Sequence, residues 1–240
     1  MSGRSERTGG TTTLAVTAAP TWLDPEPTVG GRAVVVAPHP DDEVLGTGVL
    51  LRWLAHRGVP TTIVAVTDGE ASHARSHRIT PAALCRVRAA EREAALAVLG
   101  VDPDVARLGL PDGAVAAHVD ALAEALGVHV DADTTVVAPW RGDGHPDHDA
   151  VGTGAARAAA RVGATLWEVP IWARVRRPAA AGDGALRLLA DPISAAAKRD
   201  AATCFRSQVQ PLGPAPEDGP VVHPHELAAL LAGPELVRVG

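Results

Sequence analysis

The sequence predicts an α/β protein of a single domain, with a Rossmann-like parallel sheet flanked by helices on both faces. Short runs rich in β-branched residues alternate with longer segments of helical periodicity, which is typical of parallel strand–helix units. The strand runs that precede the two clusters described below, residues 33–37 and 135–138, are almost entirely apolar, as expected of strands that are covered on both faces. The 240 residues suit one such domain with its own core, and no repeat or linker divides them.

The expected elements follow one another in a regular order. The longest helix should begin at Pro81 and end before Gly100, because proline favours the first helical turn and glycine the C-terminal cap. Strands are expected over residues 33–37, 62–67, 105–108, 135–138 and 165–169. Helices are expected over residues 44–56, 81–99, 115–126, 149–162, 192–205 and 223–231, and residues 174–190 suggest a hairpin.

Residues 1–31 differ in composition from the remainder of the chain. They are rich in Gly, Thr, Ser and Pro, which predicts a flexible N-terminal arm ahead of a domain over residues 32–240. Trp22 and Leu23 could attach the arm to the domain. No apolar segment suggests a signal peptide, and two cysteines far apart in sequence are typical of a reduced, cytoplasmic protein.

Charge and hydropathy argue against two classes of partner. The net charge is −6 and no Lys/Arg cluster is present, so we expect no binding to nucleic acid. The apolar runs are too short to span a membrane, so we expect no membrane association. The oligomeric state does not follow from the sequence.

The first cluster of chemically active side chains lies in Val34–Glu43, which reads VVVAPHPDDE. The three valines belong to an expected buried strand, and the prolines keep the preceding residues out of the helical region. The chain therefore leaves the strand and presents one imidazole, His39, and three carboxylates. In open α/β sheets, ligands bind at the carboxyl ends of the strands, which is where this cluster lies.

A second cluster follows another short apolar strand. Residues 134–139 read TTVVAP, and the next ten residues include His145, Asp147 and His148. Two such clusters, each at the end of a buried strand, predict one metal site assembled from two loops. The ligands would be His39, one of the adjacent Asp41 and Asp42, and one of the two histidines, which leaves a position for water.

The two motifs, including the GHPDH sequence of the second, resemble the PIG-L/LmbE-like family of zinc-dependent N-deacetylases. The similarity covers residues 32–208 and includes the Thr67-Asp68-Gly69-Glu70 turn. By position, it implies His39, Asp42 and His148 as ligands of one Zn²⁺ per chain, or of a related divalent metal.

The same resemblance implies the catalytic residues. Asp41 would be the general base, and His145 would stabilise the oxyanion and protonate the leaving amine, with Asp147 orienting His145. Arg88 and Asp112 lie where family members contact substrate. The implied reaction is removal of an acetyl group from an N-acetylated amino sugar, such as an N-acetylglucosaminyl glycoside or a natural-product intermediate.

Three other functions fit part of the pattern. A metal amidase could cleave a larger acyl group, as mycothiol-conjugate amidases do. Two histidines and one carboxylate also describe the facial triad of iron oxygenases, but these need no additional acid and base beside the metal. A dinucleotide-binding protein is excluded because the first strand ends in APHPDDE and not in GxGxxG.

Several of these side chains also have a structural explanation. Glu43 could cap a helix N-terminus, Arg88 and Glu91 could form an ion pair on a helix surface, and Asp112 lies in a Pro-Asp-Gly turn. Trp140 and Trp172 follow strand ends and could stack on a sugar or pack in the core. The remaining histidines that we expect to be exposed are His73, His77, His223 and His225.

Overall fold

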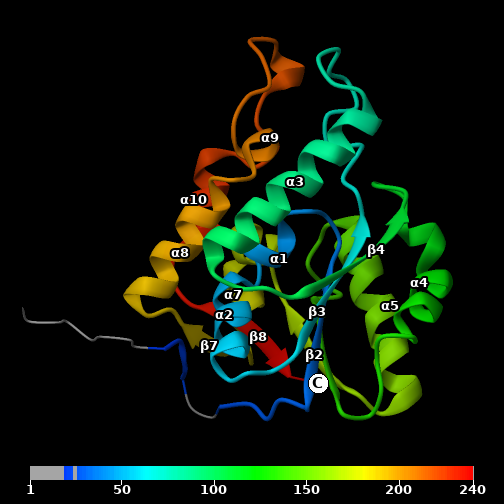
Figure 1. Cartoon of the computed structure of the whole chain (residues 1–240), viewed down its shortest axis with the longest axis vertical. Helices are drawn as coiled ribbons and strands as arrows, with labels where there is room; N and C mark the ends of the chain where they lie inside the picture. Colours follow the sequence, from blue (N-terminus) through cyan, green and yellow to red (C-terminus); the bar gives the residue numbers. More distant parts are fainter. Residues whose placement is uncertain (1–18, 24–25, 240) are drawn as a thin grey trace, which may run out of the picture.

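The computed structural model describes residues 19–23 and 26–239, which form a mixed eight-stranded sheet between helices (Figure 1). The strand order is β1-β7-β8-β6-β5-β2-β3-β4. The strands are β1 (Thr21–Trp22), β2 (Arg32–Ala37), β3 (Thr61–Thr67), β4 (Asp104–Leu110), β5 (Thr134–Pro139), β6 (Thr165–Val169), β7 (Leu186–Leu189) and β8 (Glu235–Val239). The helices are α1 (Asp42–Leu45), α2 (Gly48–His56), α3 (Pro81–Leu99), α4 (Val119–Leu126), α5 (Pro146–Val162), α6 (Trp172–Arg176), α7 (Pro178–Gly182), α8 (Pro192–Ala202), α9 (Arg206–Val209) and α10 (Pro224–Leu231), with 3-10 turns η1 (Val115–His118) and η2 (Pro216–Asp218).

Strand β2 lies in the middle of the parallel part of the sheet. Val35 pairs with Ile63 of β3 on one side and with Val137 of β5 on the other. Because β2 and β5 are parallel neighbours, the loops that follow them leave the same edge of the sheet side by side. This is the position at which open α/β sheets bind their ligands.

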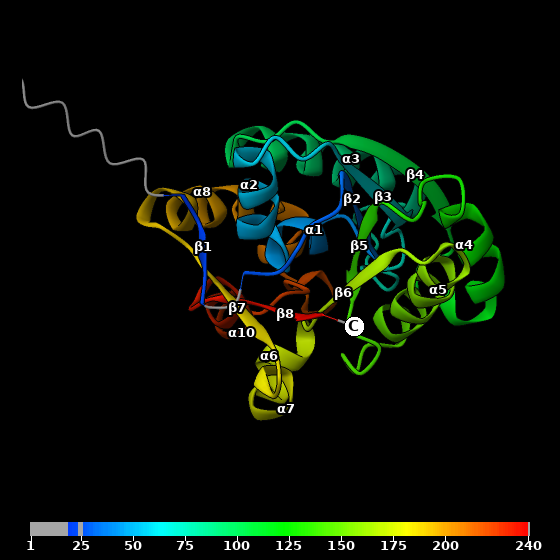
Figure 2. The same cartoon turned by 90° about the horizontal axis from the view of Figure 1, so that it is seen from below.

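Alternate side chains of β2 divide the interior into two cores. Val35 packs with apolar residues of α2 and α3, including Leu50 and Leu99, in one core. Val34 packs with α4 and α5, including Leu122, in the other. Figure 2 shows α2, α3 and α8 on one side of the sheet and α4 and α5 on the other. The α/β class with helices on both faces is therefore confirmed.

Two expected helices are interrupted. The helix expected over residues 44–56 is divided into α1 and α2, and at the break the Thr47 hydroxyl donates to the Glu43 carbonyl at 2.6 Å. The helix expected over residues 115–126 begins as the 3-10 turn η1. By contrast, the helix from Pro81 to Leu99 is confirmed, with Gly100 in the left-handed conformation as its cap.

The sheet is not parallel throughout. The hairpin expected over residues 174–190 is wrong, because this segment forms α6, α7 and β7, and the helix expected over 192–205 ends at Ala202. Strands β1, β7 and β8 pair antiparallel, and β8 pairs antiparallel with β6. Strand β8 reads ELVRV, with buried residues alternating with more exposed ones, so it lacks a continuous apolar run such as that of β2.

Part of the expected N-terminal arm lies in the described residues. Trp22 packs edge-on against Trp53 and Trp167, with ring centroids 5.6 and 5.8 Å away, so it attaches β1 to the domain. Leu23 is 44% exposed and contributes only a backbone hydrogen bond to Arg187. Residues 1–18, 24 and 25 lie outside the described residues, and the division at residue 31 stays a prediction.

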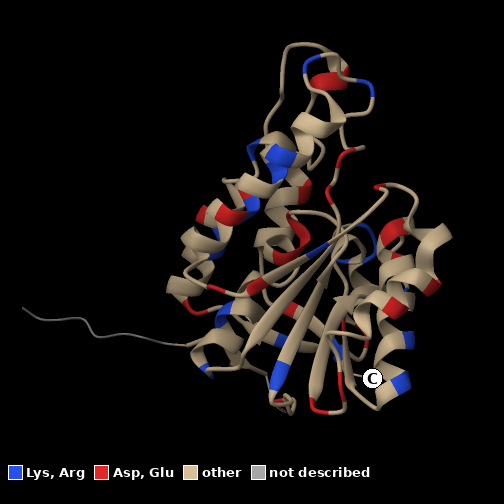
Figure 3. Cartoon of the chain, turned by 45° about the vertical axis from the view of Figure 1, so that its right-hand side comes forward, with Lys and Arg blue, Asp and Glu red and all other residues tan. Residues whose placement is uncertain are grey.

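Acidic and basic positions are interspersed over the helices and loops (Figure 3). The absence of a nucleic-acid partner stays a prediction from the low charge. Across residues 19–23 and 26–239, no helix combines the length and apolar composition that a membrane crossing requires.

Candidate active site

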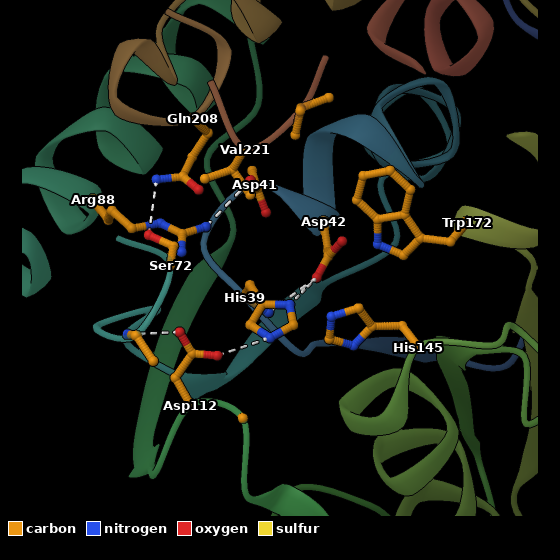
Figure 4. A pocket seen from close by; sticks show the side chains of 13 residues that line it. His39, Asp41, Asp42, Ser72, Arg88, Asp112, His145, Trp172, Gln208 and Val221 are labelled. Atoms are coloured by element: carbon orange, nitrogen blue, oxygen red, sulfur yellow. Dashed lines mark hydrogen bonds and ion pairs between the residues drawn. The ribbon is translucent and has the colours of Figure 1, made fainter. Parts of the chain in front are cut away.

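The segments that follow β2 and β5 bring three imidazoles together at the carboxyl ends of these strands, and Figure 4 shows two of them, His39 and His145. His39 follows β2, His145 is the N-cap of α5, and His148 lies in its first turn. The ring centroid of His39 lies 5.2 Å from that of His145 and 5.4 Å from that of His148. Helix α5 begins at Pro146, earlier than predicted, because proline is favoured in the first turn.

The carboxylate of Asp42 lies between His39 and His148. Its Oδ2 is 3.1 Å from His39 Nδ1 and 3.2 Å from His148 Nε2. The same oxygen accepts the backbone N–H of His39 at 3.0 Å. The residue pattern left open which of the two adjacent aspartates faces the histidines, and the structure places Asp42 there.

A divalent metal fits this group of three residues. One ligand atom each from His39, Asp42 and His148 lie within 4.8 Å of one another. His148 is fully buried, and although its ring nitrogens approach carboxylate oxygens closely, neither makes a hydrogen bond of acceptable geometry. A buried imidazole without a partner is costly, and metal coordination would satisfy it. His39, His145 and Asp147 form a second group within the same distance.

The electrostatics of the group favour a positive charge. Burial alone would lower the pKa of His148, but Asp42 and Asp143 raise it to about 9. For Asp42 the directions are reversed: burial alone would raise its pKa, but His148 and His39 hold this pKa well below its ordinary value. A cation between these groups would therefore be stabilised, as a metal ion requires.

Asp143 supports His148 from the side opposite Asp42. Its Oδ2 lies 2.9 Å from His148 Nδ1, and its carboxylate accepts backbone N–H groups of Ile171, Trp172 and Ala173 at 2.8–3.0 Å. Metal-bound histidines commonly have such a carboxylate behind them. The sequence pattern gives no role to Asp143, although an acidic residue two positions before His145, in the same loop as a predicted ligand, is a signal that points to it.

Asp41 faces an arginine. Arg88 Nη2 lies 3.2 Å from Asp41 Oδ2, and the guanidinium also donates to the carbonyls of Pro40 and Gly69, each at 3.1 Å. Gly69 has a positive φ of 69°, and a Cβ there would overlap the guanidinium. Burial raises the pKa of Asp41 to about 6, although Arg88 opposes this shift. The buried Arg88 thus holds the predicted base, and its contact with substrate stays a prediction.

Two further carboxylates approach the other nitrogen of His39. Asp112 Oδ1 and Asp147 Oδ2 each lie 3.2 Å from His39 Nε2. Backbone N–H groups hold both carboxylates, that of Ala71 for Asp112 and those of Gly113 and Val115 for Asp147. Asp112 is therefore more than a turn residue, because it lines the pocket beside His39.

The relation between His145 and Asp147 differs from the expected one. The Asp147 backbone N–H, not its carboxylate, contacts the ring, and it donates to His145 Nδ1 at 3.3 Å. The neutral ring therefore carries its proton on Nε2. Burial, together with the charges of His148 and His39, lowers the pKa of His145 to about 4. The free protein therefore holds His145 as a neutral imidazole.

The structure also decides how three other side chains are held. Glu43 accepts a backbone N–H at the helix start, that of Asp41 at 3.1 Å, as expected of a capping residue, and it is buried at 1% exposure. Glu91 makes no ion pair with Arg88; its carboxylate accepts the backbone N–H and the hydroxyl of Ser207 at 2.7 and 2.6 Å. Of the four histidines expected to be exposed, His73 is buried, at 6% exposure.

The site opens into a cavity of about 230 Å³. Figure 4 shows how the labelled residues lie around His39. Arg88, Asp112, Ser72 and Gln208 lie on one side of His39, and Trp172 lies on the other. The lining residues that we did not predict are Ala71, Ser72, Gly113, Gln208, Val221 and Val222. Trp140 lies elsewhere, with Arg238 over its ring at 4.8 Å.

Residues 34–159, just over half of the chain, match the sequence profile of the GlcNAc-PI de-N-acetylase (PIG-L) family. The chain belongs to this family. The predicted resemblance is thereby confirmed, and the match includes both motifs.

The chain is also similar to several known proteins. A deacetylase of Corynebacterium diphtheriae for 1D-myo-inositol 2-acetamido-2-deoxy-alpha-D-glucopyranoside is 52% identical over 42 residues, which span 18% of this chain and 14% of that protein. A conserved protein of Thermus thermophilus is 27% identical, with a TM-score of 0.54 over 82% of this chain and 84% of that one. The zinc-inhibited form of teicoplanin deacetylase is 18% identical, with a TM-score of 0.66 over 87% of this chain and 97% of that one. This last likeness shows the fold.

Proposed function

We propose that this chain is a zinc-dependent hydrolase that removes the acetyl group from an N-acetylated amino sugar. The observation that carries the proposal is that the predicted metal ligands and the predicted acid–base groups are different residues that lie close together. Asp42 lies between His39 and His148, while a separate carboxylate, Asp41, and a separate imidazole, His145, line the same cavity. Membership of the PIG-L family supports the same reaction. The cytoplasmic location stays a prediction.

His39, Asp42 and His148 would hold the zinc, which would polarise the amide carbonyl and make the attacking water more acidic. The remaining steps belong to the chain's own groups. The Asp41 carboxylate takes the proton of the water, and Arg88 fixes its orientation. His145 donates a hydrogen bond from its Nε2–H to the carbonyl oxygen, which stabilises the negative charge that develops on that oxygen. The proton that Asp41 took from the water then passes to the leaving amine, since the neutral His145 ring, with its proton on Nε2, has no free nitrogen to relay it.

The two alternative functions, an iron oxygenase and an amidase for a larger acyl group, differ in which pocket residues they would use. An iron oxygenase would need His39, Asp42 and His148 but gives no role to Asp41 held by Arg88 or to His145. An amidase for a larger acyl group would use the same catalytic residues. The 230 Å³ cavity lies below the usual range of ~300–1,000 Å³ for drug-sized ligands, which favours a small acyl group on one sugar.

The test is a deacetylation screen with the zinc-loaded protein. N-acetylglucosamine, its glycosides and matched N-acyl derivatives of increasing chain length are incubated with the enzyme, and the released acid is measured. We expect acetate release that disappears in Asp41→Asn. Release of longer acids in preference to acetate would favour the amidase, and metal analysis that finds iron with no acid released would favour the oxygenase.

A further inference from the structure

Two segments far apart in the sequence make the outer side of the pocket. Ala71 and Ser72 come from residues 71–80, which follow β3, and Val221 and Val222 come from residues 211–222, which follow α9. Figure 1 shows both segments projecting together beyond the body of the molecule. We call Ala71, Ser72, Gln208, Val221 and Val222 the outer wall.

The two segments are fastened together by one buried carboxylate, Asp218. Its Oδ1 accepts the Ser76 hydroxyl at 2.6 Å, and its Oδ2 accepts Arg78 Nε–H at 2.9 Å. Asp218 is 2% exposed although it lies on a projecting loop. The packing around it is tight, because a Cβ at Gly213 would overlap both Arg78 and Asp218. We call Asp218, Ser76 and Arg78 the clasp.

The outer wall has a second, weaker connection near the catalytic residues. The Gln208 amide donates to Ser72 Oγ at 3.3 Å and to Ser207 Oγ at 2.9 Å. Val222 N–H donates to the Gln208 carbonyl at 3.0 Å. Because the hydrogen bond between Gln208 and Ser72 is long, the clasp supplies the stronger link between the two segments, as charge-assisted hydrogen bonds are the stronger kind.

We propose that Asp218 is a positioning residue for substrate binding. By fastening residues 71–80 to residues 211–222, it holds the outer wall where it contacts the sugar, away from the reacting amide. The wall presents a hydroxyl and an amide beside two valines, a combination that suits the hydroxyl groups and the apolar face of a pyranose ring. The clasp does not line the cavity, so it acts through the wall. This inference rests on the proposed function for the identity of the ligand.

The test is Asp218→Asn, which keeps the size of the side chain but removes its charge. If the wall is in place in only a tenth of the molecules, the apparent affinity falls by the same factor. We therefore expect KM for N-acetylglucosamine to rise ~10-fold, with kcat within about twofold of wild type and zinc content unchanged. Gly213→Ala forces the clasp apart and leaves Asp218 unchanged, so it should have the same effect. It serves as the test if Asp218→Asn folds poorly.

The control is Asp131, which precedes β5 at the amino ends of the strands, whereas the pocket lies at their carboxyl ends. Asp131 also accepts from a hydroxyl, that of Thr134 at 2.8 Å, and from an arginine, Arg32, at 2.6 Å. Asp131→Asn should leave KM and kcat unchanged. A KM in Asp218→Asn equal to that of wild type, or a fall in kcat that accompanies loss of zinc, would overturn the proposal.

Limited trypsin digestion tests the clasp without turnover. Residues 71–80 contain Arg75 and Arg78 as cleavage sites. We expect Asp218→Asn to be cut there faster than wild type, and N-acetylglucosamine to protect wild type only. If wild type releases no acetate, the proposed function fails, but this digestion still decides the clasp. Equal cleavage rates in the two proteins would overturn it.

Discussion

The floor and the outer wall of the pocket are held in place by different kinds of contact. The floor consists of the segments that follow β2 and β5, including the first turns of α1 and α5. In it, His39 contacts Asp42, Asp42 contacts His148 and His148 contacts Asp143, each within 3.2 Å. These side chains position one another directly. The outer wall is positioned from a distance, by Asp218 and by Glu91, neither of which lines the pocket.

The difference suggests a separation of tasks. The floor places the groups that we propose bind metal and move protons, so we expect changes there to alter metal content or kcat. The wall places groups that we propose face the substrate, so we expect changes there to alter KM. The four predictions that follow test this separation, from the largest expected effect to the smallest.

Removing a predicted metal ligand should have the largest effect. His148→Ala removes the fully buried imidazole that lies between Asp42 and Asp143. We expect loss of bound metal and loss of activity, measured by mass spectrometry of metal content and by acetate release. His77→Ala, at an exposed histidine, is the control. Full metal occupancy and turnover in His148→Ala would disprove the ligand assignment.

The two adjacent aspartates should fail in different ways. Asp41→Asn keeps size and polarity but cannot accept a proton, so kcat should fall by at least ~10² with metal retained. Asp42→Ala should instead lose metal, with activity partly restored by excess zinc. Metal content and steady-state kinetics on both proteins decide the matter. Metal lost in the first and kept in the second would reverse the two roles.

Arg88→Lys should have an intermediate effect. Lysine keeps the charge beside Asp41 but cannot reproduce the fork that also binds the carbonyls of Pro40 and Gly69. We expect kcat to fall ~10-fold, on the scale of one charged hydrogen bond, with metal content unchanged. Arg92→Lys is the matched control, since Arg92 is also buried in α3 but faces Glu43. Equal losses in both variants would mean that Arg88 only stabilises the fold.

Glu91→Gln should have the smallest effect. It weakens the pair of hydrogen bonds to Ser207 that places the neighbouring Gln208 in the outer wall. We expect KM to rise ~3-fold at constant kcat, because a neutral amide replaces a charged acceptor. Glu93→Gln, at an exposed position of the same helix, should behave as wild type. A change in kcat without a change in KM would contradict the separation of floor and wall.

The sequence by itself determined where the floor lies. Each cluster follows directly on a buried strand, and neighbouring parallel strands end at the same edge, so local pattern was enough to bring His39 close to the histidines of the second cluster. The pattern also fixed the α/β class and the helix from Pro81 to Leu99. These features depend on residues close in sequence, where apolar runs, prolines and glycines determine the backbone.

Only the tertiary structure decided the remainder. It placed Asp42 and not Asp41 between the histidines, turned the carboxylate of Asp147 toward His39, and paired Arg88 with Asp41. It also joined residues 71–80 to Asp218, across about 140 residues of sequence. Which way a side chain turns depends on partners that arrive from distant segments. No periodicity or motif records such a partner, so contacts of this kind cannot be inferred from one sequence.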